Sequence, residues 1–198
     1  MSNFSEILSD IKNGHPILVV DDHDRENEGD IVIAAEKASI DNMAFCMRYA
    51  RGLMCVPCAG EILDSLELPM MVADSTDRNQ TPFTVSVDAA EGTSTGMSAA
   101  DRLATINVFL DPERKPSDLN RPGHLFPLRP QDNLLKDRRG HTEASIEVVK
   151  AAGLQRVSII VEIINDDGTM AKGNDLIKFC KKHNIRMISV QEIYDSVY

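Results

Sequence analysis

Apolar residues along the chain gather in short runs whose spacing alternates between that of strands and that of helices. Continuous or alternating apolar runs predict buried strands. We expect strands at residues 17–20, 31–35, 53–56, 83–87, 157–164 and 187–190. Apolar residues three or four positions apart predict helices. We expect helices over residues 4–11, 40–50, 98–109, 142–152 and 175–183, followed by a short last helix.

No repeat, low-complexity linker or shift in composition interrupts this mixture of strands and helices. The pattern therefore predicts a single domain, residues 1–198, with an α/β or α+β sandwich architecture. Residues 66–72 contain Pro69 and are expected to be irregular. Residues 111–140 contain five prolines and are expected to form a long loop. Loops of that length are usually functional or disordered.

Composition narrows the range of functions. An apolar fraction of 42% is enough for one hydrophobic core. The net charge of −10 argues against a nucleic-acid partner, because binding to phosphates requires clustered Lys and Arg. No run approaches the roughly 20 apolar residues of a membrane span, and the amino-terminal residues do not resemble a signal peptide. We therefore expect a cytoplasmic protein without membrane contact, whose four cysteines are reduced.

The most unusual polar stretch is Asp21–Asp30, which reads DDHDRENEGD and places six carboxylates between two apolar runs. A solvated turn is the ordinary interpretation. However, like charges this close repel one another unless a cation lies among them. In extended backbone, Asp24 and Glu28 would point one way and Glu26 and Asp30 the other. Hard divalent cations such as Mg²⁺ favour oxygen-rich sites of this kind.

An EF-hand does not account for this acidic loop. Counting from Asp24, with Gly29 at the sixth position, puts Ala35 where the bidentate glutamate should be. Arg25 offsets only one of the negative charges. Because the other carboxylates have no evident partners, we expect the loop to be mobile without ligand.

A second polar cluster, Asp137–Glu143, lies where a helix is expected to begin. We expect Thr142 to cap that helix. The free backbone N–H groups of its first turn and the helix dipole, together with Arg138, would suit a phosphate group. His141 stands at the same point and could bind a metal ion through a ring nitrogen. The alternative is an ordinary helix start with a surface histidine.

Two isolated residues are further candidates for acid–base chemistry. His124 follows Arg121-Pro122-Gly123 in the expected long loop, where a histidine is most often a surface residue. Glu162 interrupts the apolar run 157–164. Burial of a carboxylate is costly unless it is paired, and such a group often has a raised pKa that suits an acid or base. The alternative for Glu162 is an edge strand on which it faces water.

Two further motifs are weaker signals of function. Cys55 and Cys58 form a single C-x-x-C pair, which cannot close a four-thiolate zinc site. Because Cys55 ends an apolar run, core packing is favoured over a redox role. The stretch Gly92–Gly96 could cradle an oxyanion or form a simple turn. The residues alone therefore indicate a metal-dependent enzyme that acts on a small phosphorylated substrate.

Taken together, these segments resemble the 3,4-dihydroxy-2-butanone 4-phosphate synthases, an enzyme family of riboflavin biosynthesis. The resemblance covers nearly the whole chain and rests on motifs that occur in the same order. They are residues 24–30 (DRENEGD), 83–87 (FTVSV), 98–102 (SAADR), 121–124 (RPGH), 140–144 (GHTEA) and 165–170 (NDDGTM). Ordered motifs of this length are hard to obtain by chance.

The resemblance implies a lyase that converts D-ribulose 5-phosphate to formate and L-3,4-dihydroxybutan-2-one 4-phosphate. It implies a three-layer sandwich with a mixed β-sheet between helical layers, and a homodimer. It also implies a pair of Mg²⁺ or Mn²⁺ ions bridged by Glu26 and His141. The implied catalytic residues are His124, Glu162 and Asp30. The implied substrate-binding residues are Arg25, Glu26, Asp30, Arg138, Arg139, Gly140, His141, Thr142 and Glu162.

The implied chemistry begins with removal of a proton from C3 of the sugar, and a cation near the C2 carbonyl would stabilise the enediolate. Loss of water, a shift of the carbon skeleton and release of C4 as formate would follow. Three alternatives stay open at this point. They are another Mg²⁺-dependent lyase or isomerase of ribulose phosphate, a thiol redox protein that uses Cys55 and Cys58, and a non-catalytic acidic interaction module.

Overall fold

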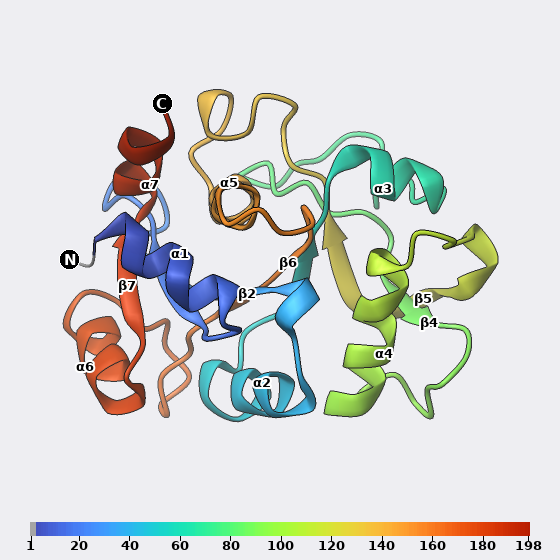
Figure 1. Cartoon of the computed structure of the whole chain (residues 1–198), viewed down its shortest axis with the longest axis horizontal. Coiled ribbons are helices and arrows are strands. Elements are labelled where there is room, and N and C mark those ends of the chain that lie inside the picture. Colours follow the sequence, from blue (N-terminus) through green and yellow to red (C-terminus); the bar gives the residue numbers. More distant parts are fainter. Residues whose placement is uncertain (1–2) are drawn as a thin grey trace.

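The computed structural model describes residues 3–198, which form a seven-stranded sheet with helices on both faces (Figure 1). The strand order is β4-β5-β3-β6-β2-β1-β7. β1 pairs in parallel with β7 and β3 pairs in parallel with β5, whereas the other pairs are antiparallel. The strands are β1 (Ile17–Val20), β2 (Gly29–Ala34), β3 (Cys55–Pro57), β4 (Val87–Ala89), β5 (Leu119–Leu128), β6 (Ser158–Glu162) and β7 (Arg186–Ser189).

The helices alternate with the strands along the chain and account for the two outer layers. They are α1 (Phe4–Lys12), α2 (Ile40–Phe45), α3 (Gly60–Ser65), α4 (Ala99–Leu110), α5 (His141–Ala151), α6 (Asn174–His183) and α7 (Val190–Val197). Short helical turns are η1 (Ala35–Lys37), η2 (Cys46–Ala50), η3 (Pro116–Asp118) and η4 (Leu134–Lys136), of which η2 is π-helical. Among the helices of residues 3–198, none combines the length and apolar character needed to cross a membrane.

Alternate residues of the central strands face two separate hydrophobic cores, as the pleat of a strand requires. On β2, Ile31 and Ile33 pack into the core that includes residues of α2, α3, α4 and α6. Val32 and Ala34 pack into the core that includes residues of α1, α5 and α7. This arrangement confirms the expected three-layer α/β sandwich with a mixed sheet between helical layers.

Several helix starts follow local sequence signals. Ser98 caps α4 as expected, and Ser189 forms a capping box with Glu192 at the start of α7. The expected cap of α5 is wrong. That helix begins at His141 with Gly140 as its N-cap residue, and Thr142 lies inside the first turn, where it is buried.

The expected loop over residues 111–140 is wrong in its centre, because Leu119–Leu128 form the ten-residue strand β5. Prolines in this segment suggested a loop because proline has no backbone N–H to donate. The sheet tolerates Pro127 because its carbonyl, and not a backbone N–H, makes the hydrogen bonds to the neighbouring segment. This carbonyl accepts from the Thr84 backbone N–H at 3.0 Å and from the Thr84 hydroxyl at 3.1 Å. His124 therefore lies on a strand and not on a loop.

Two other differences affect where polar residues lie. β2 begins at Gly29 rather than at residue 31, and this places Asp30 inside the sheet. Of the expected strand 83–87, only Val87 belongs to a ladder, whereas Phe83 and Thr84 form isolated bridges. The six-residue α3 was not expected, because it is too short to show a helical period.

Candidate active site

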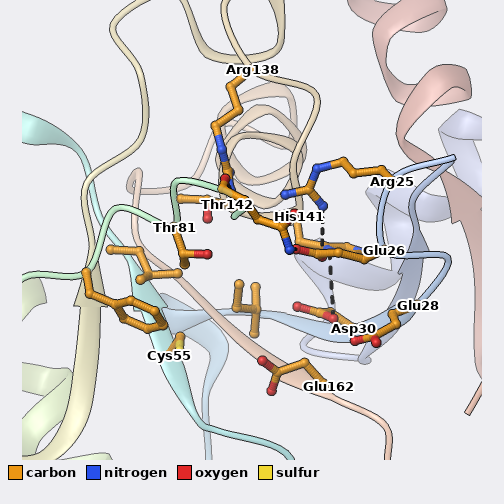
Figure 2. Close-up of a pocket in the computed structure, with 14 residues that line it drawn as sticks. Arg25, Glu26, Glu28, Asp30, Cys55, Thr81, Arg138, His141, Thr142 and Glu162 are labelled. Carbon is orange, nitrogen blue, oxygen red and sulfur yellow. Dashed lines mark hydrogen bonds and ion pairs between the residues drawn. The ribbon is translucent and has the colours of Figure 1, made fainter. Parts of the chain in front are cut away.

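A pocket opens where segments that are distant in sequence meet around the central strands (Figure 2). Its walls come from the acidic loop and β2, from β3, from residues 79–83, from the start of α5 and from β6. Most of the predicted site residues line it, namely Arg25, Glu26, Asp30, Arg138, His141, Thr142 and Glu162. The structure therefore brings the acidic loop next to the Arg138–Thr142 segment and Glu162, which both lie more than a hundred residues further along the chain.

The register of two antiparallel strands fixes one pair of carboxylates. Asp30 on β2 is the direct partner of Glu162 on β6, and residues in that relation lie side by side on one face of a sheet. Burial raises the pKa of both carboxyl groups. Figure 2 shows both carboxylates at the same side of the pocket. The pair is suited to holding a proton at one site and accepting one at the other.

The position of Glu162 depends on the absence of a side chain at Gly52. The Gly52 backbone N–H donates to the Glu162 carbonyl at 3.0 Å. A Cβ atom at Gly52 would lie 2.4 Å from that carbonyl oxygen and 2.5 Å from the Glu162 carboxylate. Both distances are far shorter than van der Waals contact. Position 52 therefore requires a glycine, because any side chain there would collide with Glu162.

The buried His141 and the half-buried Glu26 form an ion pair at the centre of the pocket. The His141 Nδ1 atom lies 3.4 Å from Glu26 Oε2 and 3.8 Å from Asp30 Oδ1. The interaction with His141 is the main reason that the pKa of Glu26 falls to about 2. Burial alone would lower the pKa of His141, but the charge of Asp30 and the contact with Glu26 outweigh it and raise that pKa to about 9. Without a bound cation, both partners are therefore charged at neutral pH.

The Asp21 carboxylate fixes the conformation of the acidic loop through hydrogen bonds to residues of the same loop. One of its carboxylate oxygens accepts from the backbone N–H of Glu26 at 3.0 Å and from the Arg25 guanidinium at 2.9 Å. The other accepts from the backbone N–H of Glu28 at 2.9 Å. Arg25 also donates to Glu26 at 2.8 Å. These bonds direct the Glu26 and Glu28 side chains into the pocket.

The expected alternation of carboxylates along this loop is wrong. Glu26, Glu28 and Asp30 all line the pocket, whereas the Asp24 side chain is fully exposed. The loop is a turn and not extended backbone, and Asn27 has a φ of 56°. The expectation of unpartnered charges is also wrong, because Asp21 and Glu26 are both paired with Arg25. Mobility of the loop without ligand stays a prediction.

Arg138 reaches the pocket from the segment before α5. Its guanidinium donates to the fully buried Glu143 at 2.7 Å and to the Asn79 carbonyl at 3.1 Å. Gly140 lets the chain turn closely beneath this side chain, because a Cβ there would lie 2.2 Å from Arg138 Nη1. The first turn of α5 directs backbone N–H groups toward the same region, and a helix amino terminus with an arginine beside it attracts anions.

The residues at the centre of the pocket fit a divalent cation. Within residues 3–198, four buried side-chain atoms lack a hydrogen-bond partner, and Asp30 Oδ1, His141 Nε2 and Glu162 Oε2 are among them. Ligand atoms of Asp21, Glu26 and His141 all lie within 4.8 Å of one another. Glu26 and His141 are the better-placed ligands, because both line the pocket whereas Asp21 does not, and because His141 Nε2 has no hydrogen-bond partner. Carboxylate oxygen with imidazole nitrogen suits Mg²⁺ or Mn²⁺.

Three predicted site residues do not line the pocket. Gly140 lies beneath the Arg138 side chain, and the other two, His124 and Arg139, point elsewhere. His124 is exposed on β5, where its ring nitrogen Nδ1 lies 2.7 Å from Asp88 and its backbone N–H donates to the same carboxylate at 2.9 Å. Arg139 points to α7, where its guanidinium carbon lies 3.3 Å from the centre of the Tyr194 ring. Neither residue is part of the pocket lining in this chain.

The cysteine pair and the glycine-rich stretch have structural roles. Cys55 and Cys58 are both buried, and burial raises the pKa of both thiols. A redox cysteine requires the opposite, namely exposure and a lowered pKa. The backbone N–H groups of Ser94, Thr95 and Gly96 do cradle an anion, but that anion is the carboxylate of Asp101 in the same chain.

Sequence reasoning missed Asn79 as a pocket residue. Its side-chain amide donates to Glu26 Oε1 at 2.8 Å, and its backbone carbonyl accepts from Arg138. It therefore contacts both the metal-ligand cluster and the arginine of the anion site. Asn79 lies in an exposed polar stretch without a period or a motif, and no sequence signal could have identified it.

The mixed sheet and its pocket define an α/β enzyme whose site suits a divalent cation and an anionic substrate. Residues 5–196 match the model of the 3,4-dihydroxy-2-butanone 4-phosphate synthase family. A synthase of that name from Hamiltonella defensa is 43% identical over 98% of this chain and 89% of its own length. The one from Candida albicans is 46% identical over 97% of this chain and 95% of its own length.

The solved structures agree with the sequence comparisons. A crystal structure of 3,4-dihydroxy-2-butanone 4-phosphate synthase in complex with two magnesium ions superposes with a TM-score of 0.95 at 36% identity. It covers 100% of this chain, and this chain covers 97% of it. The chain therefore belongs to the 3,4-dihydroxy-2-butanone 4-phosphate synthase family, whose enzymes act in riboflavin biosynthesis.

Proposed function

We propose that this enzyme converts D-ribulose 5-phosphate to formate and L-3,4-dihydroxybutan-2-one 4-phosphate. The observation that carries the proposal is the meeting of the Asp30–Glu162 pair with Glu26, His141 and Arg138 in one pocket. The two products together contain all the atoms of the substrate, so that the reaction needs neither an oxidant nor a reductant. The chemistry then requires proton transfer, charge stabilisation and a phosphate anchor, and each has a candidate group in the pocket.

The phosphate anchor is the segment from Arg138 to Thr142. Arg138 is half-buried and already pairs with Glu143, which fixes the direction of its guanidinium. The free N–H groups at the start of α5 complement the negative charge of a phosphate. Arg25, on the opposite side of His141 in Figure 2, is placed to contact sugar hydroxyl groups.

Glu26 and His141 would hold Mg²⁺ or Mn²⁺. The magnesium-bound relative carries two ions, and we propose the same number for this enzyme. The cation supplies Lewis-acid stabilisation of negative charge at an oxygen of the substrate. Asp21 and Asn79 keep the Glu26 carboxylate in place through hydrogen bonds to its backbone N–H and its side chain.

Asp30 and Glu162 are the proposed acid–base groups within this chain. Burial raises the pKa of Asp30 to about 7, which favours proton exchange near neutral pH. Burial also raises the pKa of Glu162 above its ordinary value. The first step is removal of the C3 proton of the sugar. Later steps return protons as one water molecule is eliminated, one water molecule is added back to C4, and C4 leaves as formate. Both carboxyl groups lie on the floor of the pocket, and burial shields them from competing water.

We also propose that the enzyme is a homodimer and that His124 acts in the pocket of the second copy. His124 is exposed and lies outside the pocket of its own chain, whereas its Asp88 partner fixes the ring. Mixing a His124→Ala variant with a Glu26→Gln variant tests this arrangement. Subunit exchange should restore one intact site per mixed dimer, and no recovery of activity would contradict a shared site. The cytoplasmic location and the single domain over residues 1–198 stay predictions.

The reaction is tested with ribulose 5-phosphate labelled with ¹³C at C4. The enzyme is incubated with Mg²⁺ in one sample and with EDTA in another, and the products are followed by NMR. We expect labelled formate only in the sample with Mg²⁺. Turnover without formate would indicate an isomerase, and absence of turnover in both samples would contradict the proposed function.

A further inference from the structure

The last helix lies beside the segment that carries Arg138 (Figure 1). Within this contact, the Arg139 guanidinium carbon lies 3.3 Å from the centre of the Tyr194 ring, which is a close stacking distance. The same guanidinium donates to the side-chain oxygen of Gln191 at 3.1 Å. Both partners of Arg139 are therefore on α7, and the side chain points away from the pocket.

A second contact of the same kind lies on the other side of Arg138. The Lys136 ammonium lies 4.3 Å from the centre of the Tyr198 ring. The Tyr198 hydroxyl contacts the Asn133 carbonyl at 3.4 Å and makes a short contact with the buried carboxylate of Glu147. The two tyrosine rings also pack together, with their centres 5.0 Å apart.

These contacts matter because Arg138 lies in an irregular segment. Between η4 and α5, residues 137–140 make no strand or helix that could fix their direction. Their backbone is held at one end by the buried Leu135 and at the other by the first turn of α5. The bonds to Glu143 and Asn79 hold the end of the Arg138 side chain, and the contacts of the flanking side chains hold the backbone from which it extends.

We propose that Tyr194 and Tyr198 form an aromatic clamp that holds Arg139 and Lys136 and thereby positions Arg138 and the start of α5 for the phosphate. Arg139 is then a positioning residue and not a substrate ligand. This inference rests on the proposed function in one respect, namely that the phosphate binds at the Arg138–Thr142 segment.

The test compares three single variants of the full-length enzyme. Tyr194→Leu removes the ring under Arg139, and Tyr194→Phe keeps the ring without the hydroxyl. Tyr49→Leu is the matched control, because Tyr49 is the one remaining tyrosine of the chain and lies outside the pocket. Affinity for inorganic phosphate is measured by calorimetry with Mg²⁺ present, and kcat and KM are measured with ribulose 5-phosphate.

A cation–aromatic contact that is partly shielded from water changes an equilibrium by about tenfold. We expect Tyr194→Leu to weaken phosphate binding and raise KM by about that factor, with kcat nearly unchanged. Tyr194→Phe and Tyr49→Leu should behave like the unaltered enzyme. A merely structural role would lower the melting temperature without this selective change in KM.

Other outcomes are equally decisive. Unchanged phosphate affinity and KM in Tyr194→Leu would overturn the clamp, and so would equal losses in Tyr194→Leu and Tyr194→Phe. Weakened phosphate binding without any turnover in the unaltered enzyme would support the clamp while contradicting the proposed reaction. If Tyr194→Leu does not fold, Arg139→Met replaces it and Arg139→Lys, which keeps the charge, serves as the conservative variant.

Discussion

The two sides of the pocket are built in different ways. Asp30 and Glu162 lie on paired strands of the central sheet. Glu26 and Arg138 lie on irregular segments that are held by hydrogen bonds of side chains to the backbone and to one another. Groups on paired strands cannot separate without breaking the sheet, but groups on loops can move when their partners change. We infer that the proton-transfer groups are fixed in advance and that the binding groups adjust to the ligand.

The largest expected effect comes from the strand-borne carboxylates. Glu162→Gln and Asp30→Asn each remove a proton-transfer group while keeping its shape. We expect kcat to fall by about a thousandfold, since general acid–base catalysis contributes on the order of 10² to 10⁴. Thermal stability should be kept or should rise, because a buried carboxylate with a raised pKa disfavours its own charged form.

Asp24→Asn is the control for this experiment, because Asp24 belongs to the same acidic loop but is fully exposed. Steady-state kinetics and a thermal melt compare kcat and the melting temperature of the three variants. A comparable loss of kcat in Asp24→Asn would show that net charge of the loop, and not the strand pair, governs the reaction.

Two glycine substitutions test the difference between the fixed side of the pocket, which carries Asp30 and Glu162, and the adjustable side, which carries Glu26 and Arg138. In Gly52→Ala, the new methyl group meets the Glu162 backbone, which cannot move away. We expect kcat to fall by about 100-fold, as for a displacement on the order of 1 Å of a catalytic group, and stability to fall by about 1–3 kcal/mol. In Gly140→Ala, the methyl group meets the end of the flexible Arg138 side chain.

Gly140→Ala should therefore raise KM for the phosphorylated substrate and leave kcat and the melting temperature nearly unchanged. Both variants are measured by steady-state kinetics and by chemical denaturation. If Gly140→Ala lowers kcat as strongly as Gly52→Ala does, the proposed contrast between the two sides of the pocket is wrong.

The ion pair between Glu26 and His141 leads to a pH dependence of metal binding. The pKa of His141 is raised from 6.5 to about 9, so that a cation must displace a proton from the ring at neutral pH. The apparent affinity for Mg²⁺ or Mn²⁺ should rise by about tenfold per pH unit and level off near pH 9. In the metal-free enzyme the stability gained from protonated His141 is present below pH 6.5 and is lost as the pH rises through 9.

Calorimetry at pH 7.5 in two buffers with different ionisation enthalpies measures the proton release. We expect close to one proton released per His141 that binds a cation, and a melting temperature of the metal-free enzyme that falls between pH 6.5 and 9. Metal binding without proton release would mean that His141 is already neutral and that the ion pair with Glu26 is weaker than the structure indicates.

The sequence carried more information about the fixed side than about the adjustable side. Glu162 was identified because a carboxylate inside an apolar strand is conspicuous, and the strands around it followed from hydrophobic runs. Pairing of Asp30 with Glu162 could not be predicted, because register depends on contacts between strands that are far apart in sequence.

Loop geometry was the main source of error. The sequence of the acidic loop predicts extended backbone with alternating carboxylates. Hydrogen bonds from backbone N–H groups to Asp21 instead impose a turn that directs Glu26 and Glu28 the same way. Such a local bond between a side chain and the backbone leaves no periodic signal. The prolines of β5 favour a loop when only the sequence is considered. Whether a strand can contain them depends on which of its backbone groups the neighbouring strands use for hydrogen bonds.

The smallest expected effect concerns Asn79, which joins the two loop-borne groups. Removing its side chain in Asn79→Ala deletes the 2.8 Å hydrogen bond to Glu26, and one such bond contributes about 0.5–1.5 kcal/mol. We expect affinity for Mn²⁺ to fall by about fivefold, with little change in stability because the residue lies on an exposed stretch.

Gln80→Asn is the control, since an asparagine tolerates the φ of 51° at that position and the Gln80 amide donates to the Asp77 carbonyl instead of to Glu26. Equal Mn²⁺ affinities in Asn79→Ala and the unaltered enzyme would mean that Asp21, Arg25 and His141 orient Glu26 without help from Asn79.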